Sequence, residues 1–453
     1  MSMTPDIEMF LHRKAEELKE INSFDPSDYD KADIKRGLRN ADGTGVIAGL
    51  SHICNVQGYY IQDGERMPMP GRLTYRGINV KKLAQSFIDE NRFGYEETAY
   101  LLLFGELPTR SELEEFKACL TDFRMLPNRF TEDMILAAPS RNIMNKLQRS
   151  VLAMYSYDDD PEPGSVEGEL RQSLQLISRT PTIIAHAFAA KKHYYDNDSL
   201  YLHRPQDDLS LAENFLYAMR HDKRFTELEA RLLDICLVLH MDHGGGNNSA
   251  FACRVLASTG TDLYSSISAA VGSLKGARHG GASNRVQEMF KCIKAGVSDW
   301  SDDEEVTRFL EKISLGEAGD GSGLIYGIGH AIYTMSDPRA DVLKKMARSL
   351  AEQNGMTKEL DLLETVERLA PDVINRASGE KRVMCANVDF YSGFVYRMLD
   401  IPEEFYTPLF AMARMVGWCA HRIEEAYNPG RIIRPAYKVI SASKTFVPIA
   451  ERK

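Results

Sequence analysis

The spacing of apolar residues constrains the fold of this 453-residue chain more than any other feature. It repeats close to every 3.6 residues along most of the sequence, the period of a helix with one buried face. In the segment 226–244, Thr226 and Glu229 have the spacing of a capping box, and an apolar stripe follows until Gly244 stops it. This pattern predicts a long helix ending near Gly244.

Other segments carry helix signals at their ends. Ser210 begins a second capping box, and Gly105 with Pro108 separates two helices. Thr407 is expected to cap a helix with Pro408 in its first turn. That helix is apolar on nearly all faces, so we expect it to be central and buried.

Strand signals are confined to the two ends of the chain. Three candidates, 43–56, 58–64 and 71–77, lie near the N-terminus, and a fourth, 444–449, lies near the C-terminus. The sequence therefore predicts a mostly α fold with minor β-strands near the N-terminus and the C-terminus.

Composition excludes several classes of protein. The net charge of −10 argues against a nucleic-acid partner, and no apolar run approaches the length that would cross a membrane. Residues 1–20 contain acidic residues and lack the apolar core of a signal peptide. The seven cysteines are scattered without C-x-x-C spacing, which favours reduced thiols. We expect a cytoplasmic protein.

Three histidines stand in settings that favour a ligand site. His243 precedes "GGGNNS", His279 precedes "GGASN", and His330 lies in "GIGHAIYTMSDPR". Glycine beside a histidine lets backbone and ligand approach closely. Asp389 lies among apolar and aromatic residues in "NVDFYSGF", where a carboxylate resists ionisation and can serve as a general base.

Each of these residues also has a purely structural interpretation. A histidine at a helix C-terminus interacts favourably with the helix dipole, which would explain His243. Asp389 could cap the helix that begins at "FYSGFVYRML". Arg339 in "DPRA" could pair with Asp337 or Asp341.

A metal site is a further alternative, which would make the chain a metal-dependent hydrolase. His240 and His243 are three residues apart with Asp242 between them, and His279 or His330 could complete a zinc shell. The chain lacks H-E-x-x-H and paired C-x-x-C motifs, and the triple glycine suits a loop around an organic ligand. We therefore expect no metal.

Six motifs occur in order along the chain: "LHMDHGGGNNSAF", "SLKGARHGGASN", "GIGHAIYTMSDPRA", "NVDFYSGFVY", "AMARMVGWCAH" and "RIIRPAYK". Together they resemble the citrate synthase family, which includes 2-methylcitrate synthase, from about residue 45 to the end. The resemblance implies a nearly all-helical homodimer of two-domain subunits. The large domain would comprise 1–279 and 389–453, and the small domain 280–388.

The resemblance also implies roles for individual residues. The family condenses acetyl-CoA with oxaloacetate and hydrolyses the thioester to citrate and CoA, at the entry to the tricarboxylic acid cycle. Asp389 would be the base, His279 would donate to the thioester oxygen, and His330 would polarise the keto oxygen. His243, Arg339 and Arg414 would hold oxaloacetate, and Arg434 would reach the site of the partner subunit. No cofactor is implied, because the CoA thioester is a substrate.

The sequence departs from the family in places that concern CoA. Many members carry a cation at the positions of Ala331 and Thr334. Lys275 and Arg278 could hold the CoA phosphates instead, as could the lysine pair at 344–345. The strand region 55–71 is longer than usual, and residues 1–40 form a charged helical extension.

Two questions about activity stay open from the sequence. The same mechanism serves propionyl-CoA in 2-methylcitrate synthase, and one methylene changes discrimination by only about 1–3 kcal/mol. A non-catalytic relative would keep the fold, but the intact set of Asp389, His279 and His330 argues against it.

Overall fold

The structure is a computed structural model, and it describes residues 5–21, 23, 25, 27, 29, 34–40, 42–428, 430–441 and 443–452. The chain divides into two units, Met1–Gly49 with Arg434–Lys453, and Leu50–Ile433. Parts of the expected extension at 1–40 lie outside the described residues.

Three elements are defined in the described part of the first unit. They are α1 (Pro5–Ile21), η1 (Arg36–Leu38) and η5 (Ile449–Glu451). The expected strand at 444–449 is wrong, because this segment forms no strand in the described part of the chain and η5 begins at its last residue. A strand needs a neighbour with which to form a ladder, and no described strand pairs with this segment.

The second unit begins with an antiparallel sheet in the order β1-β2-β3, formed by β1 (Cys54–Gln62), β2 (Glu65–Tyr75) and β3 (Ile78–Asn79). β1 and β2 are joined by Asp63 and Gly64, whose φ values of 53° and 81° suit a two-residue hairpin turn. The expected strands near the N-terminus are thus confirmed from residue 54 onward. Residues 46–53 form no strand, so the first candidate begins later than expected.

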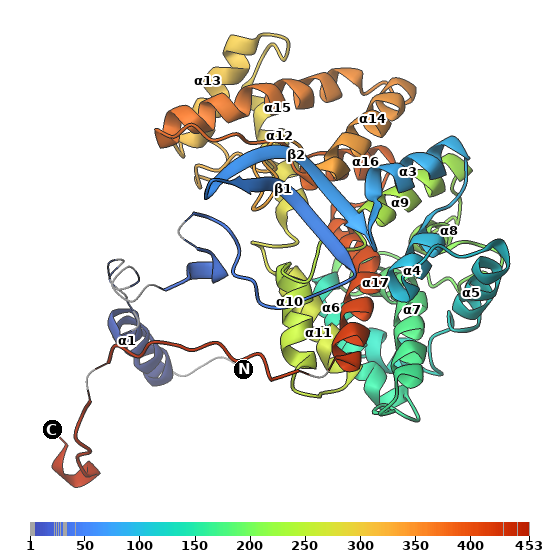
Figure 1. Ribbon diagram of the computed structural model, residues 1–453, viewed down its shortest axis with the longest axis horizontal. Helices are drawn as coiled ribbons and strands as arrows, with labels where there is room; N and C mark the ends of the chain where they lie inside the picture. The colour runs from blue at the N-terminus through green and yellow to red at the C-terminus, as the bar shows by residue number, and fades with distance from the viewer. Residues whose placement is uncertain are drawn as a thin grey trace. The chain divides into compact units, whose positions relative to one another are not determined.

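Helices make up most of the rest of the unit, which confirms the mostly α fold (Figure 1). They are α3 (Val80–Asp89), α4 (Tyr95–Phe104), α5 (Arg110–Asp122), η2 (Thr131–Leu136), α6 (Ile143–Ala153), η3 (Met154–Tyr157), α7 (Val166–Asp196), α8 (Leu211–Met219), α9 (Glu227–His240), α10 (Asn248–Ala257), α11 (Leu263–Lys275), α12 (Ala282–Gly296), α13 (Asp303–Ser314), α14 (Pro338–Gln353), α15 (Thr357–Ser378), α16 (Val388–Met398), η4 (Glu403–Phe405) and α17 (Tyr406–Tyr427).

The helix ends follow local chemistry. Capping boxes begin α8 at Ser210 and α9 at Thr226, as predicted, and Gly105 ends α4 with a φ of 98°. Two expectations are wrong in detail. α9 ends at His240, before Gly244, and Thr407 lies inside α17, where its hydroxyl donates to the carbonyl of Gly280 at 2.9 Å.

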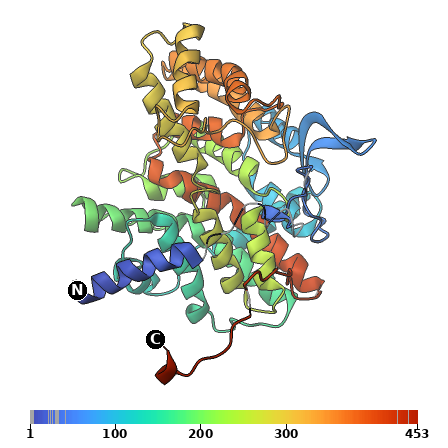
Figure 2. The ribbon, with the colours of Figure 1, turned by 90° about the vertical axis from the view of Figure 1, so that its left-hand side faces the viewer.

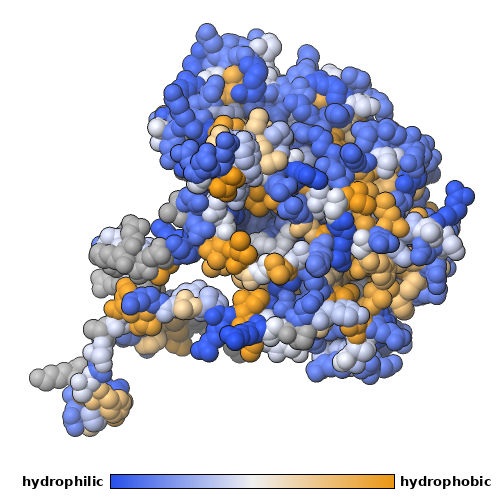
Figure 3. Space-filling view, in the orientation of Figure 1, coloured by the Kyte–Doolittle hydropathy of each residue, from blue (hydrophilic) through white to orange (hydrophobic). Residues whose placement is uncertain are grey.

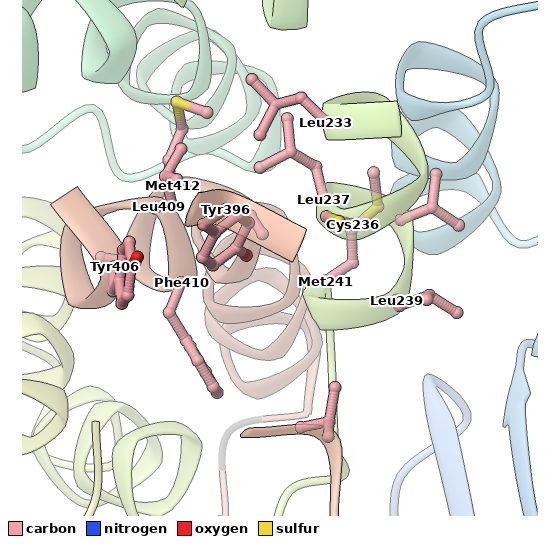
Figure 4. Close-up of a cluster of buried hydrophobic side chains, with 14 of the residues drawn as sticks. Leu233, Cys236, Leu237, Leu239, Met241, Tyr396, Tyr406, Leu409, Phe410 and Met412 are labelled. Atoms are coloured by element: carbon pink, nitrogen blue, oxygen red, sulfur yellow. The ribbon is translucent and has the colours of Figure 1, made fainter. Parts of the chain in front are cut away.

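α17 is the central helix of this unit, and its residues are buried almost without interruption from Tyr406 to Arg422, as predicted. It packs against α4, α7, α9, α10 and α11. Figure 4 shows a buried cluster in which side chains of α9, such as Leu237, lie near Tyr396 of α16 and Phe410 of α17. This cluster supports the end of α9, where the histidine motif begins.

The segment between α11 and α16 gathers at one end of the unit. Seen from the side, α12–α15 stand together at the top (Figure 2), and contacts link α12 to α13, α13 to α15, and α14 to α15. The surface over these helices is mostly hydrophilic on the face shown in Figure 3. Within the described residues, no helix is both long and apolar enough to cross a membrane.

Gly417 allows α17 to approach the end of α9 closely. A Cβ atom at this position would lie 2.4 Å from the carbonyl oxygen of Met241 and 2.7 Å from Oδ1 of Asp242. Both neighbours are held in the core, so neither can move away. Gly272 in α11 differs, because the atom that a Cβ would meet at 2.4 Å is Nε2 of Gln148, the end of a flexible side chain.

We expect Gly417→Ala to destabilise the fold by about 1–3 kcal/mol, the usual cost of an overpacked core. Gly272→Ala should change stability much less, because Gln148 can turn aside and alanine favours helix. Thermal midpoints of the two variants test this contrast. Equal midpoints would show that the contact between α17 and Met241 is not restrictive.

Candidate active site

The site is built on the turn that follows α9. His240 donates from Nδ1 to the carbonyl of Cys236 at 2.7 Å, which fixes its ring along the last turn of the helix. Asp242 is fully buried and accepts the backbone N–H of Gly244 at 3.0 Å. Gly244 has a φ of 81°, a conformation that glycine adopts without strain. This turn places His243, which is 7% exposed, at the edge of the core.

A buried chain of polar groups holds Asp242. Arg254 approaches Nδ1 of His421 with Nε at 3.1 Å and Nη2 at 2.8 Å, and it also pairs with Glu424 and Glu425. A guanidinium only donates, so Nδ1 of His421 accepts and its Nε2 carries the proton. Nε2 then donates to the Asp242 carboxylate at 3.2 Å. Burial opposes the charge on Asp242, but His421 and then Arg414 hold its pKa below the usual value.

Sequence reasoning missed the role of His421, although it lies in the quoted motif "AMARMVGWCAH". A polar residue in a stretch that is otherwise apolar was the available signal. His240 and Asp242 support the end of α9 and the turn after it through their hydrogen bonds.

His243, His330 and Tyr333 form one aromatic group. The ring centroids of His243 and His330 are 5.1 Å apart, and His330 stacks on Tyr333 at 4.6 Å. Burial lowers the pKa of His243 well below its usual value, and Arg339, His330 and Arg414 add to the effect. Nε2 of His243 is buried with no hydrogen-bond partner among the described residues. His243 is therefore a neutral ring with an unused polar atom.

The tautomer of His330 is set by its own loop. The backbone N–H groups of Ile332 and Tyr333 donate to Nδ1 of His330 at 3.0 Å and 3.1 Å. Since Nδ1 accepts two hydrogen bonds, the ring proton resides on Nε2. His330 can thus act as a neutral donor through Nε2.

The same loop is joined to the start of α16. Gly329 donates from its N–H to the carbonyl of Cys385 at 2.8 Å, and Asn387 donates from Nδ2 to the carbonyl of Gly329 at 3.0 Å. Asn387 also caps α16, accepting the N–H of Asp389 at 3.0 Å. The interpretation of Asp389 as the cap is therefore wrong, and its half-buried carboxylate lies in the first turn.

The pKa of Asp389 is raised to about 6. Burial is the main cause, Arg339 opposes the shift, and the nearby Asp337 adds to it. A carboxyl group with such a pKa is mostly ionised at neutral pH and is a stronger base than an exposed aspartate. This is the property expected of Asp389 from its apolar sequence setting.

Two buried arginines differ in their partners. Arg339 pairs with Asp337 through two contacts, Nε to Oδ1 at 3.0 Å and Nη2 to Oδ2 at 2.7 Å, as the structural interpretation suggested. Arg414 is fully buried and donates from Nε to the carbonyl of His240 at 3.1 Å. Its Nη1 and Nη2 have no partner in the described part of the chain, and burial lowers its pKa to about 10. The N–H groups of these two nitrogens are thus available for an anion.

His279 lies between α11 and α12. Its Nε2 is 3.1 Å from Oγ of Ser249, and the Trp418 indole donates to the same Oγ at 3.1 Å. Burial and, to a smaller extent, Arg414 lower the pKa of His279 to about 4, so the ring is neutral at neutral pH. The single proton of the Ser249 hydroxyl can be donated to Oδ1 of Asn247 at 2.9 Å or to Nε2 of His279, and in the second case the proton of the neutral ring resides on Nδ1. Ser249 was not identified from the sequence, where only its place in "GGGNNS" marked it.

Six of the predicted residues share one electrostatic and aromatic neighbourhood. Arg414 acts on the pKa values of His243, His279 and Asp389, and its guanidinium lies 4.5 Å from the ring centroid of Phe410. His279 contacts the same ring at 6.4 Å. The six are His243, His279, His330, Arg339, Asp389 and Arg414.

The remaining predicted residues are the cations expected to hold CoA and Arg434. Lys275 ends α11 and Arg278 follows it, both exposed near His279. Lys344, the other proposed CoA contact with Lys345, pairs with Glu367 at 2.6 Å. Arg434 is exposed and belongs to the first unit.

The arrangement provides a base, neutral donors and an anion site. Asp389 has the pKa of a usable base, the rings of His279 and His330 can donate hydrogen bonds, and Arg414 has two nitrogens without a partner among the described residues. Across the described residues, no three His, Cys, Asp or Glu side chains are arranged to hold a metal ion.

Known proteins with similar sequences and structures agree on one family. The family described as "Citrate synthase, C-terminal domain" matches residues 40–436. Citrate synthase of Synechocystis is 33% identical over 423 residues, which cover 92% of this chain and 94% of that protein. 2-Methylcitrate synthase of Shewanella oneidensis is 31% identical over 381 residues, which cover 84% of this chain and 92% of that protein.

A solved structure extends the comparison to the fold. Citrate synthase from Thermoplasma acidophilum, in a ternary complex with carboxymethyl coenzyme A and oxaloacetate, superposes with a TM-score of 0.75 at 27% identity. The match covers 92% of this chain and 99% of that one. With sequence and fold in agreement over nearly the whole length, the chain belongs to the citrate synthase family of acyltransferases, which convert the acyl group to an alkyl group on transfer.

Proposed function

We propose that this enzyme condenses acetyl-CoA with oxaloacetate and hydrolyses the resulting citryl-CoA to citrate and CoA. The observation that carries the proposal is the unpaired Arg414 guanidinium, buried beside Arg339 in a group of neutral histidines. The two Nη atoms of Arg414 lack a hydrogen-bond acceptor, and an anionic ligand would supply one and offset the buried charge. Oxaloacetate has two carboxylates, and the planar guanidinium binds a carboxylate through two parallel hydrogen bonds.

In this proposal, His243 and Arg339 complete the oxaloacetate site. Nε2 of His243 has no partner among the described residues, so it can bond the substrate. Arg339 keeps Asp337 as its partner through Nε and Nη2, which leaves Nη1 for the ligand. His330 donates from Nε2 to the keto oxygen and makes the keto carbon more electrophilic.

The carbon–carbon bond then forms at the methyl group of acetyl-CoA. Asp389 removes a methyl proton, while His279 donates to the thioester oxygen as the enolate develops. The enolate carbon attacks the keto carbon, and the former keto oxygen becomes the citryl hydroxyl group. Water then cleaves the thioester, releasing CoA as a thiol and the new carboxylate. Lys275 and Arg278 are proposed to contact the CoA phosphates.

The closest competing function is that of 2-methylcitrate synthase, which the relative from Shewanella oneidensis favours. Thiol release from acetyl-CoA and from propionyl-CoA, each with oxaloacetate, tests the two functions in one assay. We expect the larger kcat/KM with acetyl-CoA. A larger value with propionyl-CoA would assign the enzyme to 2-methylcitrate synthesis, and no thiol release with either would reject both.

We also propose the domain division and the homodimer expected for the family. Residues 280–388 would form a small domain, and 1–279 with 389–453 a large one. Asp389 and His330 would then lie on opposite sides of the boundary, so that closure of the cleft completes the site and excludes water. Arg434 would contribute to the site of the partner subunit.

Activity should depend on pH through Asp389. The pKa of this group is raised to about 6, and only the ionised form accepts a proton. We therefore expect kcat/KM, which reports the free enzyme, to be constant well above that pH and to fall about tenfold per unit well below it. Asp389→Asn should have no condensation activity at any pH while it still binds oxaloacetate. A pH profile that stays flat down to 5 would contradict the assignment of the base.

The two buried arginines should respond differently to replacement by methionine. Arg414→Met removes an unpaired buried charge, so the thermal midpoint of the free enzyme should not fall, while oxaloacetate affinity drops about 100-fold or more. Arg339→Met leaves Asp337 buried without its partner and should destabilise the fold by about 3–5 kcal/mol. Calorimetry and oxaloacetate titration measure both effects. An Arg414→Met variant that loses stability and keeps its affinity would reverse the roles.

A mixed dimer tests the proposed contribution of Arg434. Asp389→Asn and Arg434→Ala are each expected to be inactive. In a dimer of one chain of each kind, one site lacks both groups, and the other combines the intact Asp389 and the intact Arg434 from different chains. Isolated with two tags, this dimer should have up to about half of wild-type activity. If Arg434 served its own subunit, a folded mixed dimer would be inactive.

A further inference from the structure

We propose that the β1–β2 hairpin fixes the position and tautomer of His330, and that Thr334 is the positioning residue through which it does so. The inference rests on the proposed function, since it concerns how His330 becomes a donor for the keto oxygen. It concerns the contact of the strands β1 and β2 with the loop that follows His330.

The loop after His330 is bonded to the hairpin at several points. The Thr334 hydroxyl donates to the carbonyl of Gly58 at 2.6 Å and lies 3.4 Å from the carbonyl of Met69. The N–H of Gly71 donates to Oγ of Ser336 at 3.2 Å. The Thr334 hydroxyl is therefore engaged by both strands.

These bonds use the part of the ladder where β1 and β2 do not pair. The register runs from Cys54 opposite Tyr75 to Gln57 opposite Arg72, and resumes with Tyr59 opposite Pro68. Gly58 on one strand and 69–71 on the other are left out of it. Such an irregularity frees backbone groups from the ladder. The freed groups include the ones that bind Thr334 and Ser336.

The two glycines let the hairpin lie directly against the loop. A Cβ at position 58 would be 2.4 Å from the carbonyl oxygen of Ile332 and 2.6 Å from Cα of Tyr333. A Cβ at position 71 would be 2.0 Å from the carbonyl oxygen of Ser336. The hairpin backbone therefore contacts the loop backbone on both sides of Thr334.

The loop passes this constraint to the catalytic ring. Ile332 and Tyr333, which Gly58 touches, are the residues whose N–H groups donate to Nδ1 of His330. Tyr333 also stacks on the His330 ring and is 1% exposed. A shift of the loop would lengthen both hydrogen bonds to Nδ1 and weaken the preference for the Nε2 proton. The hairpin thus acts on the chemistry of His330 without touching the substrate.

Thr334→Val tests the proposal, because valine keeps the shape of threonine and removes the donor. The infrared carbonyl stretch of bound oxaloacetate reports how strongly His330 polarises the keto group. We expect this band to shift less from its free position than in the wild type. We also expect kcat to fall about threefold to tenfold, with a smaller change in KM for oxaloacetate. Thr334→Ser restores the hydroxyl and should recover both.

Thr259→Val is the matched control. Its hydroxyl also donates to a backbone carbonyl, that of Leu256 at 2.7 Å, at the end of α10. It should leave kcat and the carbonyl band at wild-type values. If Thr334→Val does not fold, Ser336→Ala removes the acceptor of the Gly71 N–H in the same contact and should give a smaller change in the same direction.

The outcomes separate this inference from the proposed function. A wild-type enzyme that shifts the oxaloacetate band, together with a Thr334→Val variant that shifts it equally and keeps its kcat, would overturn the role of the hairpin. If Thr334→Val fails to fold, a Ser336→Ala variant with the wild-type band shift and the wild-type kcat would overturn the role of the hairpin. A wild-type enzyme that binds oxaloacetate without any band shift would instead refute the proposed role of His330.

Discussion

The charge on Arg414 is the constraint on which the rest of the site depends. Its guanidinium is fully buried, and two of its three nitrogens have no hydrogen-bond partner among the described residues. Leaving a buried charge unpaired is costly, so a fold retains one only where something offsets it. Here the backbone carbonyl of His240 accepts from Nε, and the charge of Asp242 favours the ionised form.

Asp242 in turn needs the chain of His421 and Arg254. Without a donor, a second buried charge would add to the cost, but the proton on Nε2 of His421 faces its carboxylate. Arg254 fixes that proton by donating to Nδ1, and Glu424 and Glu425 balance the charge of Arg254. The buried charges therefore alternate in sign along this chain from Arg414 to the two glutamates. This alternation also holds the turn at Gly244 in place.

The local part of this arrangement was predictable from the sequence, and the long-range part was not. Capping boxes at Ser210 and Thr226 and the break at Gly105 are encoded within a few residues, and the structure has them. The hydrogen bond between Arg254 and His421 joins residues 167 positions apart, and that of Thr334 with Gly58 joins residues 276 apart. No periodicity reports such contacts.

The errors have the same origin. Thr407 has the composition of a helix cap, but packing against Gly280 uses its hydroxyl instead. The β-branched and aromatic residues within 444–449 suit a strand, yet a strand needs a neighbour that local sequence does not specify. The candidate site was found because ordered motifs identify its residues one by one. How Ser249 and Asp337 hold those residues depends on the fold.

Burial of the two arginines also determines which protonation states the site can use. Burial lowers the pKa values of both His243 and His279, and a positively charged imidazolium would also be repelled by the buried arginines. Arg339 and Arg414 lower the pKa of His243, and Arg414 lowers that of His279. A neutral imidazole is a weak acid, so it can share a hydrogen bond with a developing enolate without losing its proton. The same arginines limit the rise in the pKa of Asp389, which burial alone would carry further. Burial and the arginines together thus keep His243 and His279 neutral, while the arginines keep the base ionised at neutral pH, the combination that proton removal from a weak carbon acid requires.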